Sequence, residues 1–356
     1  MAATGELELR THPPYLSEDR GEIAAFLLAR GLEPPADEAD YAVSFLRGGA
    51  MVGSGSRKGR ILRGIAVDEA ERGGGLAARI VSELEAEASR RGVGGLFVFT
   101  KPDNRAIFES LGYRELAAAR GAAVLLEKGG GLDAWLASLR AELGPASGPP
   151  ESGPVAALVM NCNPFTLGHR HLVATAASRS SRVILFVVSE EASSFPFEVR
   201  RRLVREGVAD FPNVRVVAGS DYLVSRATFP TYFLKDRAGE AAEIHARLDA
   251  DLFGRRIAPA LGVARRYVAE EPYSPVTATY NRALAEVLPP LGVELVEIPR
   301  LALGGAAVSA SAVRRAIREG RLDAARSLVP ESTWNYLASP EAAPVLARVA
   351  AAEGRH

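Results

Sequence analysis

The 356-residue sequence contains one cysteine, Cys162, which excludes an internal disulfide and any zinc site built from several cysteines. It also lacks an excess of either charge, because its 43 Lys and Arg residues equal its 43 Asp and Glu residues. Proteins that bind nucleic acid usually carry a basic surplus, so this balance argues against nucleic acid as a partner. A small anionic ligand needs only a local site and is compatible with the composition.

Long hydrophobic runs are missing too. The run "VILFVV" at 183–188 is far shorter than a membrane span, and the first residues carry acidic side chains where a signal peptide would have a hydrophobic core. We therefore expect a cytoplasmic protein with no membrane partner. The remaining composition, 47% hydrophobic and 24% charged, is ordinary for a globular protein, and the length is sufficient for two domains.

A segment rich in Pro, Gly and Ser at 143–154 reads as a linker between two such domains. We predict a first domain at 1–127, a helix and linker at 128–153, a second domain at 154–340 and a C-terminal tail at 341–356. The composition of the linker favours relative movement of the two domains.

In the first domain, residues 61–92 predict a strand, a Gly-rich turn and an amphipathic helix. Glycines at the start of a helix let backbone N–H groups approach an anion, and the helix dipole favours a pyrophosphate there. A second strand is expected at 94–100, followed by "NRAIFESLGYREL" at 104–116. The simpler alternative is a Gly-rich turn that only connects strand and helix.

These segments together resemble the GCN5-related acetyltransferase family. Arg72, Gly75 and Ala77 meet the pattern Arg-x-x-Gly-x-Ala of its phosphate-binding turn. Its closing segment is matched by Asn104, Phe108, Leu111, Gly112 and Tyr113. The resemblance implies a mixed-sheet domain that binds coenzyme A or a pantetheine arm through Arg72, Gly73, Gly75, Ala77 and Asn104.

Phe108 departs from that family, because many members have a tyrosine there that protonates the leaving thiolate. Phenylalanine has no hydroxyl group and cannot act as a general acid. No histidine lies between His12 and His169 to act as a base. We therefore expect the first domain to bind a thiol carrier without being an acetyltransferase.

The second domain alternates apolar segments with helical patterns, and it is expected to form a Rossmann-like parallel sheet covered by helices on both faces. Strands are predicted at 155–161, 182–188, 213–219, 265–270 and 293–298. The fold class is therefore α/β in both domains, mixed in the first and parallel in the second. In parallel sheets of this kind the ligand binds at the carboxyl ends of the strands.

The stretch "MNCNPFTLGHRHL" at 160–172 follows the first of these strands. It resembles the first signature of the HIGH-type nucleotidyltransferase superfamily, with Thr166, Gly168 and His169 as its core. A second signature, Ser-x-Ser-x-x-Arg, is met by Ser309, Ser311 and Arg314 at the start of a predicted helix. Taken singly, each has a simpler alternative: a surface histidine for the first and an ordinary helix N-cap for the second.

The segments at 193–204, 227–236, 251–263 and 270–281 resemble the citrate lyase ligase family. The resemblance implies that acetate and ATP give acetyl-AMP and pyrophosphate. The acetyl group then passes to the thiol of a dephospho-coenzyme-A-type prosthetic group on the acyl carrier subunit of citrate lyase. Mg²⁺ would bridge the ATP phosphates, with no metal site built by the protein alone.

Residue roles follow from these resemblances. His169, Ser311 and Arg314 would stabilise the charge that grows on the phosphates, and Lys235 would reach the α-phosphate or the carboxylate. As an alternative, Lys235 is a solvated surface lysine. ATP would be bound by the two signatures and a later loop, that is by Asn161, Asn163, Pro164, Phe165, Thr166, Gly168, His169, Ser309, Ser311, Arg314, Tyr280 and Asn281.

Cys162 and Arg200 are given structural roles. Cys162 is predicted to be a small buried residue, because the carrier supplies the thiol and no thiol intermediate on the protein is needed. Arg200 is predicted to pack near the first signature. Two other functions stay open: an adenylyltransferase acting on a phosphopantetheine- or nucleotide-like acceptor, and an acetyltransferase with a nucleotide-binding domain.

Overall fold

The computed structural model describes residues 6–12, 17–32, 34, 39–145, 153–191, 193–225 and 239–352. The chain forms two compact units, Met1–Asp133 and Ala134–His356. The boundary therefore precedes the Pro- and Gly-rich segment at 143–154, most of which lies outside the described residues. Each unit has a sheet and a hydrophobic core of its own.

The first unit contains a seven-stranded sheet in the order β1-β2-β3-β4-β5-β7-β6. Its strands are β1 (Leu7–His12), β2 (Tyr41–Arg47), β3 (Ala50–Lys58), β4 (Ile61–Val67), β5 (Leu96–Thr100), β6 (Arg114–Ala119) and β7 (Ala123–Lys128). Neighbouring strands are antiparallel except β4 and β5, so the expected mixed sheet is confirmed.

Three helices accompany this sheet: α1 (Ser17–Leu28), α2 (Leu76–Arg90) and α3 (Arg105–Ser110), with short 3-10 turns at Glu69–Glu71 and Pro102–Asn104. The apolar residues Leu76, Ile80 and Leu84 of α2 recur at helical spacing and are buried against the sheet. The predicted order of strand, Gly-rich turn and amphipathic helix is thus confirmed by β4 and α2.

The second unit contains a five-stranded parallel sheet in the order β10-β9-β8-β11-β12. All five predicted strands are confirmed, as β8 (Val155–Met160), β9 (Arg182–Val187), β10 (Val214–Ala218), β11 (Val263–Ala269) and β12 (Glu294–Ile298). The chain moves outward from β8 to β10 on one side and then places β11 and β12 on the other. The order of strands therefore reverses between β8 and β11, and a ligand crevice is expected at their carboxyl ends.

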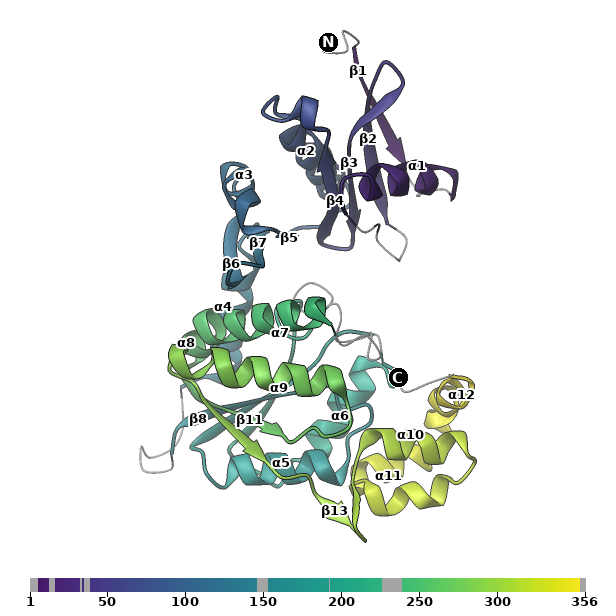
Figure 1. Cartoon of the computed structure of the whole chain (residues 1–356). Helices are drawn as coiled ribbons and strands as arrows, with labels where there is room; N and C mark the ends of the chain where they lie inside the picture. The colour runs from purple at the N-terminus through teal and green to yellow at the C-terminus, as the bar shows by residue number, and fades with distance from the viewer. Residues whose placement is uncertain are drawn as a thin grey trace. The chain divides into compact units, whose positions relative to one another are not determined.

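Helices cover both faces of this sheet (Figure 1). They are α4 (Gly131–Leu143), α5 (Leu167–Ala177), α6 (Phe197–Gly207), α7 (Glu240–Leu252), α8 (Ala258–Leu261), α9 (Pro275–Val287), α10 (Ala310–Arg318), α11 (Glu331–Leu337) and α12 (Ala343–Ala351). A π-helical turn at Phe253–Ile257, 3-10 turns at Pro289–Leu291, Leu322–Leu328 and Pro340–Ala342, and a small hairpin of β13 (Ala302–Leu303) and β14 (Ala306–Ala307) complete the unit.

The apolar residues of α5, α6 and α10 to α12 share one core with β8 and β9. On the opposite face, α7 and α9 lie side by side (Figure 1), and Trp135 of α4 packs against Phe186 of β9 at 6.2 Å between ring centroids. The segment predicted as a separate tail, 341–356, joins the first of these cores through the buried Val345 and Val349. No helix among the described residues has the length and apolar character to cross a membrane.

Candidate functional site

A cavity of about 770 Å³ lies where the carboxyl ends of β8, β11 and β12 meet the starts of α5, α9 and α10. Most of the residues predicted for the nucleotide line it: Asn161, Asn163, Thr166, Gly168, His169, Tyr280, Asn281, Ser309, Ser311 and Arg314. Two others do not line it, Pro164 and Phe165. Phe165 is fully buried in the core, where its ring stacks on the His169 ring at 5.9 Å. Lys235 lies outside the described residues.

The start of α5 fixes the protonation of His169. The Thr166 side chain caps the helix by accepting from the His169 backbone N–H at 3.3 Å, and the Thr166 N–H donates to His169 Nδ1 at 3.1 Å. Because Nδ1 accepts, the ring proton resides on Nε2. Burial, with the nearby cations Arg300 and Arg314, lowers the pKa of His169 to about 4. At neutral pH His169 therefore presents a neutral N–H donor.

The start of α10 meets the start of α5. Ser309 caps α10 by accepting from the Ala312 N–H at 3.1 Å. A Cβ atom at Gly168 would lie 2.8 Å from the Val308 carbonyl oxygen, so the backbones approach each other only because position 168 has no side chain. Two helix N-termini, each with partial positive charge, thus open into one cavity.

Arg314 joins the two signatures. Its side chain is 2% exposed, and its guanidinium donates to the Asn163 carbonyl and, at 3.3 Å, to Ser311 Oγ. Burial lowers its pKa to about 10, which leaves it cationic at neutral pH. The side chain of Asn163 is also engaged, because its Oδ1 accepts from the Phe195 N–H at 3.0 Å. Both residues therefore brace the turn after β8 as well as lining the cavity.

The predicted structural role of Arg200 is confirmed. It is fully buried and donates to the carbonyls of Asn161 at 2.9 Å and Val188 at 2.6 Å. The predicted burial of Cys162 is confirmed as well, with 1% exposure. That burial raises the pKa of the thiol to about 12, so the sulfur stays protonated and unreactive at neutral pH.

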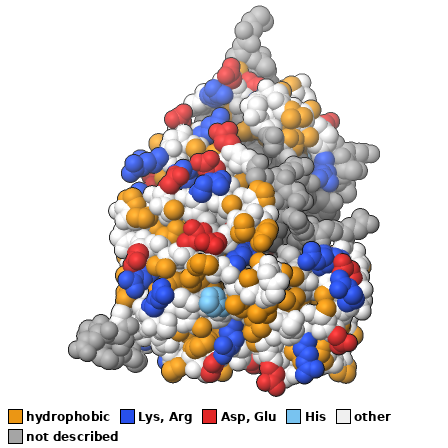
Figure 2. All heavy atoms as spheres, turned by 60° about the horizontal axis from the view of Figure 1, so that its bottom comes forward, with side chains coloured by type: hydrophobic (Ala, Val, Ile, Leu, Met, Phe, Trp, Pro, Cys, Tyr) orange, Lys and Arg blue, Asp and Glu red, His pale blue; other side chains and the backbone are white. Residues whose placement is uncertain are grey.

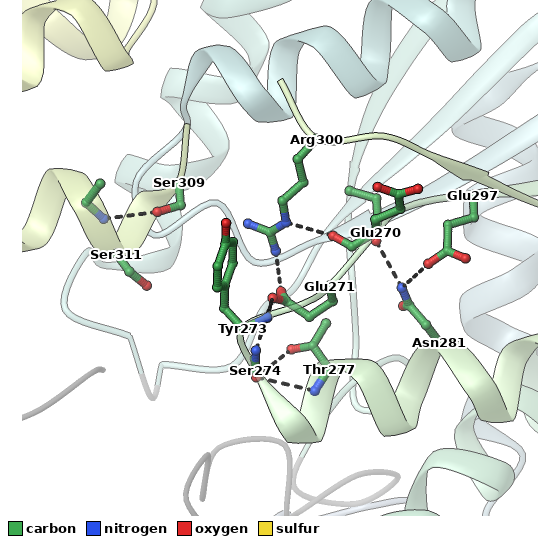
Figure 3. A network of polar contacts seen from close by, with 12 residues as sticks. Glu270, Glu271, Tyr273, Ser274, Thr277, Asn281, Glu297, Arg300, Ser309 and Ser311 are labelled. Atoms are coloured by element: carbon green, nitrogen blue, oxygen red, sulfur yellow. Dashed lines mark hydrogen bonds and ion pairs between the residues drawn. The ribbon is translucent and has the colours of Figure 1, made fainter. Parts of the chain in front are cut away.

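A polar network around Arg300 was not predicted from the sequence (Figure 3). Arg300 pairs with the Glu271 carboxylate and donates from Nε to the Glu270 carbonyl at 2.7 Å. Glu271 in turn accepts from the backbone N–H groups of Tyr273 and Ser274, at 3.0 and 3.1 Å. The network orders the loop between β11 and α9. The sequence indicates this network only through Arg300, a cationic residue that follows the predicted strand at 293–298.

Tyr280 and Asn281, predicted to contact adenosine or the acyl group, are partly used by the fold. The Tyr280 hydroxyl donates to Asp249 Oδ2 at 2.6 Å. Asn281 Nδ2 donates to the Ala269 carbonyl at 2.9 Å and to Glu297 at 3.2 Å, which ties the ends of β11 and β12 together.

Figure 2 turns the bottom of Figure 1 toward the viewer. A histidine lies among hydrophobic side chains in this view, with Lys, Arg, Asp and Glu side chains around them.

The Gly-rich turn of the first unit has a different character. Gly73 and Gly75 adopt φ of 79° and 77°, and Gly75 is the residue directly before α2. Nothing lies within 4 Å of where their Cβ atoms would be, so the backbone there is open to an approaching anion. The Arg72 side chain is 68% exposed and pairs with Glu69 at 3.3 Å.

The strands β4 and β5 pair only at Ile61 with Phe97 and Leu62 with Val98. No further pairing joins these two strands toward Val67, the end of β4 that precedes the Gly-rich turn. Asn104 donates to Thr100 Oγ1 at 3.0 Å. Phe108 is 5% exposed and packs edge-to-face on Tyr113, so it serves the core and supplies no acid.

Comparisons with known proteins agree over most of the chain. Residues 155–337 match the citrate lyase ligase C-terminal domain family, and residues 26–123 match the acetyltransferase (GNAT) domain family. The chain is 39% identical over 292 residues to the citrate (pro-3S)-lyase ligase of Klebsiella pneumoniae, covering 81% of this chain and 83% of that protein. It is 36% identical over 324 residues to the Escherichia coli (strain K12) enzyme of the same name, covering 89% of each. A shorter similarity, 45% over 67 residues, joins 18% of this chain to 41% of a phosphopantetheine adenylyltransferase from Methylococcus capsulatus.

Proposed function

Because the chain belongs to the citrate lyase ligase family, we propose that it uses ATP to acetylate the thiol prosthetic group on the acyl carrier subunit of citrate lyase, and so activates that enzyme. The intermediate is acetyl-AMP, which makes the protein an AMP-forming acid–thiol ligase. The observation that carries the proposal is the meeting of two helix N-termini, the His169 donor and Arg314 at one cavity.

In the first step an acetate oxygen attacks the α-phosphorus of ATP. The new O–P bond forms as the bond to the bridging oxygen breaks, and pyrophosphate leaves with the electron pair. Acetate is already ionised at neutral pH, so the step needs positioned donors and no general base. The Nε2–H of His169, the Ser311 hydroxyl and the first N–H groups of α5 and α10 suit the charge on the departing phosphates.

Mg²⁺ would enter bound to the ATP phosphates and would neutralise part of their charge. In the described part of the chain, no three His, Cys, Asp or Glu side chains are grouped so as to hold a metal ion.

In the second step the carrier thiol attacks the acetyl carbonyl carbon of acetyl-AMP. A C–S bond forms, the bond to the AMP oxygen breaks, AMP leaves with the electron pair, and the thiol proton is released. The prosthetic group combines a pantetheine arm with a pyrophosphate. The Gly-rich turn and the part of β4 that does not pair with β5 suit these two parts, so the first unit would bind the carrier's arm.

The test measures pyrophosphate release and the intact mass of the carrier in parallel. We expect pyrophosphate release that depends on acetate, and a carrier mass increase of one acetyl group that depends on both acetate and ATP. Omitting acetate and supplying a carrier without its prosthetic group are the matched controls. Acetyl transfer from acetyl-coenzyme A without ATP would instead identify an acetyltransferase.

The short similarity to a phosphopantetheine adenylyltransferase favours a second candidate, adenylyl transfer to a phosphopantetheine-like acceptor. It would release pyrophosphate without acetate and would add AMP to the acceptor. Supplying phosphopantetheine in the same assay therefore separates the two functions by the mass of the product.

A further inference from the structure

Arg266 of β11 is a buried cation with unused hydrogen-bond donors. It is 1% exposed and lines the cavity. Its Nη2 donates to the Tyr280 hydroxyl at 3.3 Å, and its guanidinium lies 4.3 Å from the centre of the Phe253 ring. Among the described residues, Nε and Nη1 of Arg266 have no hydrogen-bond partner.

The fully buried Arg200 shows what a structural arginine looks like in this unit. Its Nε donates to the Phe195 carbonyl at 2.9 Å and its Nη1 to the Val188 carbonyl at 2.6 Å. A buried guanidinium with donors left over is unfavourable unless something pairs with it. The contact with Phe253 and one long hydrogen bond offset only part of this. Arg266 is therefore suited to an anionic ligand.

The position of Arg266 in the sheet says where that ligand would lie. Successive side chains of a strand point to opposite faces, and Tyr267 belongs to the core shared with α5 and α10. Arg266 accordingly faces the other side, toward Tyr280 of α9. Tyr280 donates to Asp249, which also accepts from the Val224 N–H at 2.7 Å. Val224, Tyr280 and Arg266 thus form one wall of the cavity, held together through a buried carboxylate.

We propose that Arg266 binds the carboxylate of the acyl substrate, a small monocarboxylate, and presents its oxygen to the α-phosphorus. The inference rests on the proposed function and assigns its acyl site. In a displacement at phosphorus the attacking and leaving oxygens lie roughly in line. If the leaving phosphates lie at the starts of α5 and α10, the attacking carboxylate belongs on the opposite wall, which is where Arg266 lies. The guanidinium fork matches a carboxylate better than an ammonium group does.

Two variants of Arg266 test this, with Arg265 as the control. Arg266→Met removes the positive charge and keeps a side chain of similar volume. Arg266→Lys keeps the positive charge but loses the guanidinium group with its paired N–H donors. Arg265 is the preceding residue of β11 and pairs with Glu294 at 2.5 Å with 30% of its side chain exposed, so Arg265→Met removes a cation from the same strand without touching the cavity lining. We expect Arg266→Met to raise the KM for acetate by about 10- to 100-fold, the usual effect of losing a charge-assisted pair. The KM for acetate of Arg266→Lys should lie between the values for the wild type and Arg266→Met, and the KM of Arg265→Met should equal the wild-type value.

Binding is followed without turnover by saturation-transfer NMR on acetate, in the presence of a non-hydrolysable ATP analogue. Wild-type protein should bind acetate but not its neutral isostere acetamide, and Arg266→Met should bind neither. The dissociation constant of the ATP analogue should not change. A rise in that constant with unchanged acetate binding would assign Arg266 to the α-phosphate and overturn the proposal.

Thermal unfolding separates a ligand-binding role from a structural one. Without ligand, Arg266→Met should unfold at the wild-type temperature or above, because a poorly paired buried charge is gone. Arg200→Met should unfold at a markedly lower temperature. If Arg266→Met is destabilised as strongly as Arg200→Met, Arg266 is structural.

The kinetic results separate this inference from the proposed function. If the wild type releases pyrophosphate in response to acetate and Arg266→Met has the wild-type KM for acetate, only the role of Arg266 is overturned. A wild type without any response to acetate overturns the proposed function as well.

Discussion

The two proposed anion sites of this chain are built in opposite ways. The Gly-rich turn of the first unit offers open backbone at Gly73 and Gly75 beside an arginine that is mostly exposed. The cavity of the second unit is lined by side chains already fixed to one another, as Arg314 is to the Asn163 carbonyl and His169 is to Thr166. The first site depends on backbone shape, and the second on a preformed set of donors.

The difference matches what each site is proposed to do. Holding the arm of a carrier requires recognition of a pyrophosphate, for which backbone N–H groups at a helix start are sufficient. Stabilising charge that develops during a reaction requires donors that do not reorganise at that moment. Substitutions should therefore affect turnover in the second unit and carrier affinity in the first.

The largest effect is expected for His169→Ala. Loss of one positioned donor to developing charge should lower the rate of acetate-dependent pyrophosphate release by about 100- to 1000-fold. ATP affinity, followed with a fluorescent nucleotide, should fall much less. Thr175→Ala, on the same helix but outside the cavity lining, serves as the control and should keep most of the activity. A folded His169→Ala protein with wild-type turnover would contradict the phosphate assignment.

The two units also contain glycines that are needed for different reasons, which Gly168→Ala and Gly75→Ala would separate. At Gly168 a Cβ atom would meet the Val308 backbone at 2.8 Å, so α5 and α10 must move apart. A displacement of that kind should lower turnover by about 10- to 100-fold. At Gly75 there is space, but φ of 77° strains alanine by about 1–2 kcal/mol. Gly75→Ala should lower the unfolding temperature and leave acetate-dependent pyrophosphate release unchanged.

Arg72→Glu tests the first site directly. A negative charge at the proposed pyrophosphate position should raise the KM for the carrier by about tenfold, the size of a lost charge-assisted contact. The formation of acetyl-AMP, measured without carrier, should not change. Arg90→Glu makes the same change of charge at the far end of α2 and should leave the carrier KM near the wild-type value. Equal carrier kinetics for Arg72→Glu and wild type would give the first unit another role.

Much of the fold could be predicted from the sequence, because the strands of a sheet covered on both faces are nearly continuous apolar runs. The predicted strands at 155–161 and 182–188 agree with Val155–Met160 and Arg182–Val187. The segment at 341–356, predicted as a C-terminal tail, shows where prediction from apolar patterns fails. The Ala-rich end of the chain has a weak pattern, and only the structure shows that Val345 and Val349 complete the second core.

The lining of the cavity was predictable where contiguous residues form it and unpredictable where residues distant in the sequence meet. The residues around Thr166 and Ser309 lie at helix starts, which local patterns reveal. Arg266 lies in the middle of a strand next to Arg265, and nothing local distinguishes the buried arginine from its partly exposed neighbour. Phe165 was predicted to bind nucleotide, yet its ring is buried in the core, because membership of a motif does not determine the direction of a side chain.

A smaller effect concerns pH. His169 has a pKa of about 4 in the folded protein, below the usual value of 6.5. The unfolded chain therefore binds more protons between these values, and stability contributed by neutral His169 is present above pH 6.5 and lost as the pH falls toward 4. His245, whose pKa burial lowers to about 4, acts in the same direction. Urea unfolding at several pH values should show this fall, and His169→Gln should make it shallower. An unchanged slope would show that His169 titrates normally.

The smallest effect is expected for Cys162→Ala, although Cys162 lies among the residues that line the cavity. Its thiol is 1% exposed and its raised pKa of about 12 keeps the sulfur protonated, so it is a poor nucleophile at neutral pH. Alanine has the same Cβ atom and meets the φ of 51° with the same strain, so only the contacts of one buried sulfur are lost. We expect turnover close to that of the wild type and a loss of stability of about 1 kcal/mol. Mass spectrometry during turnover should find the acetyl group on the carrier alone, and an acetylated Cys162 would mean that the acetyl group passes through the protein's own thiol.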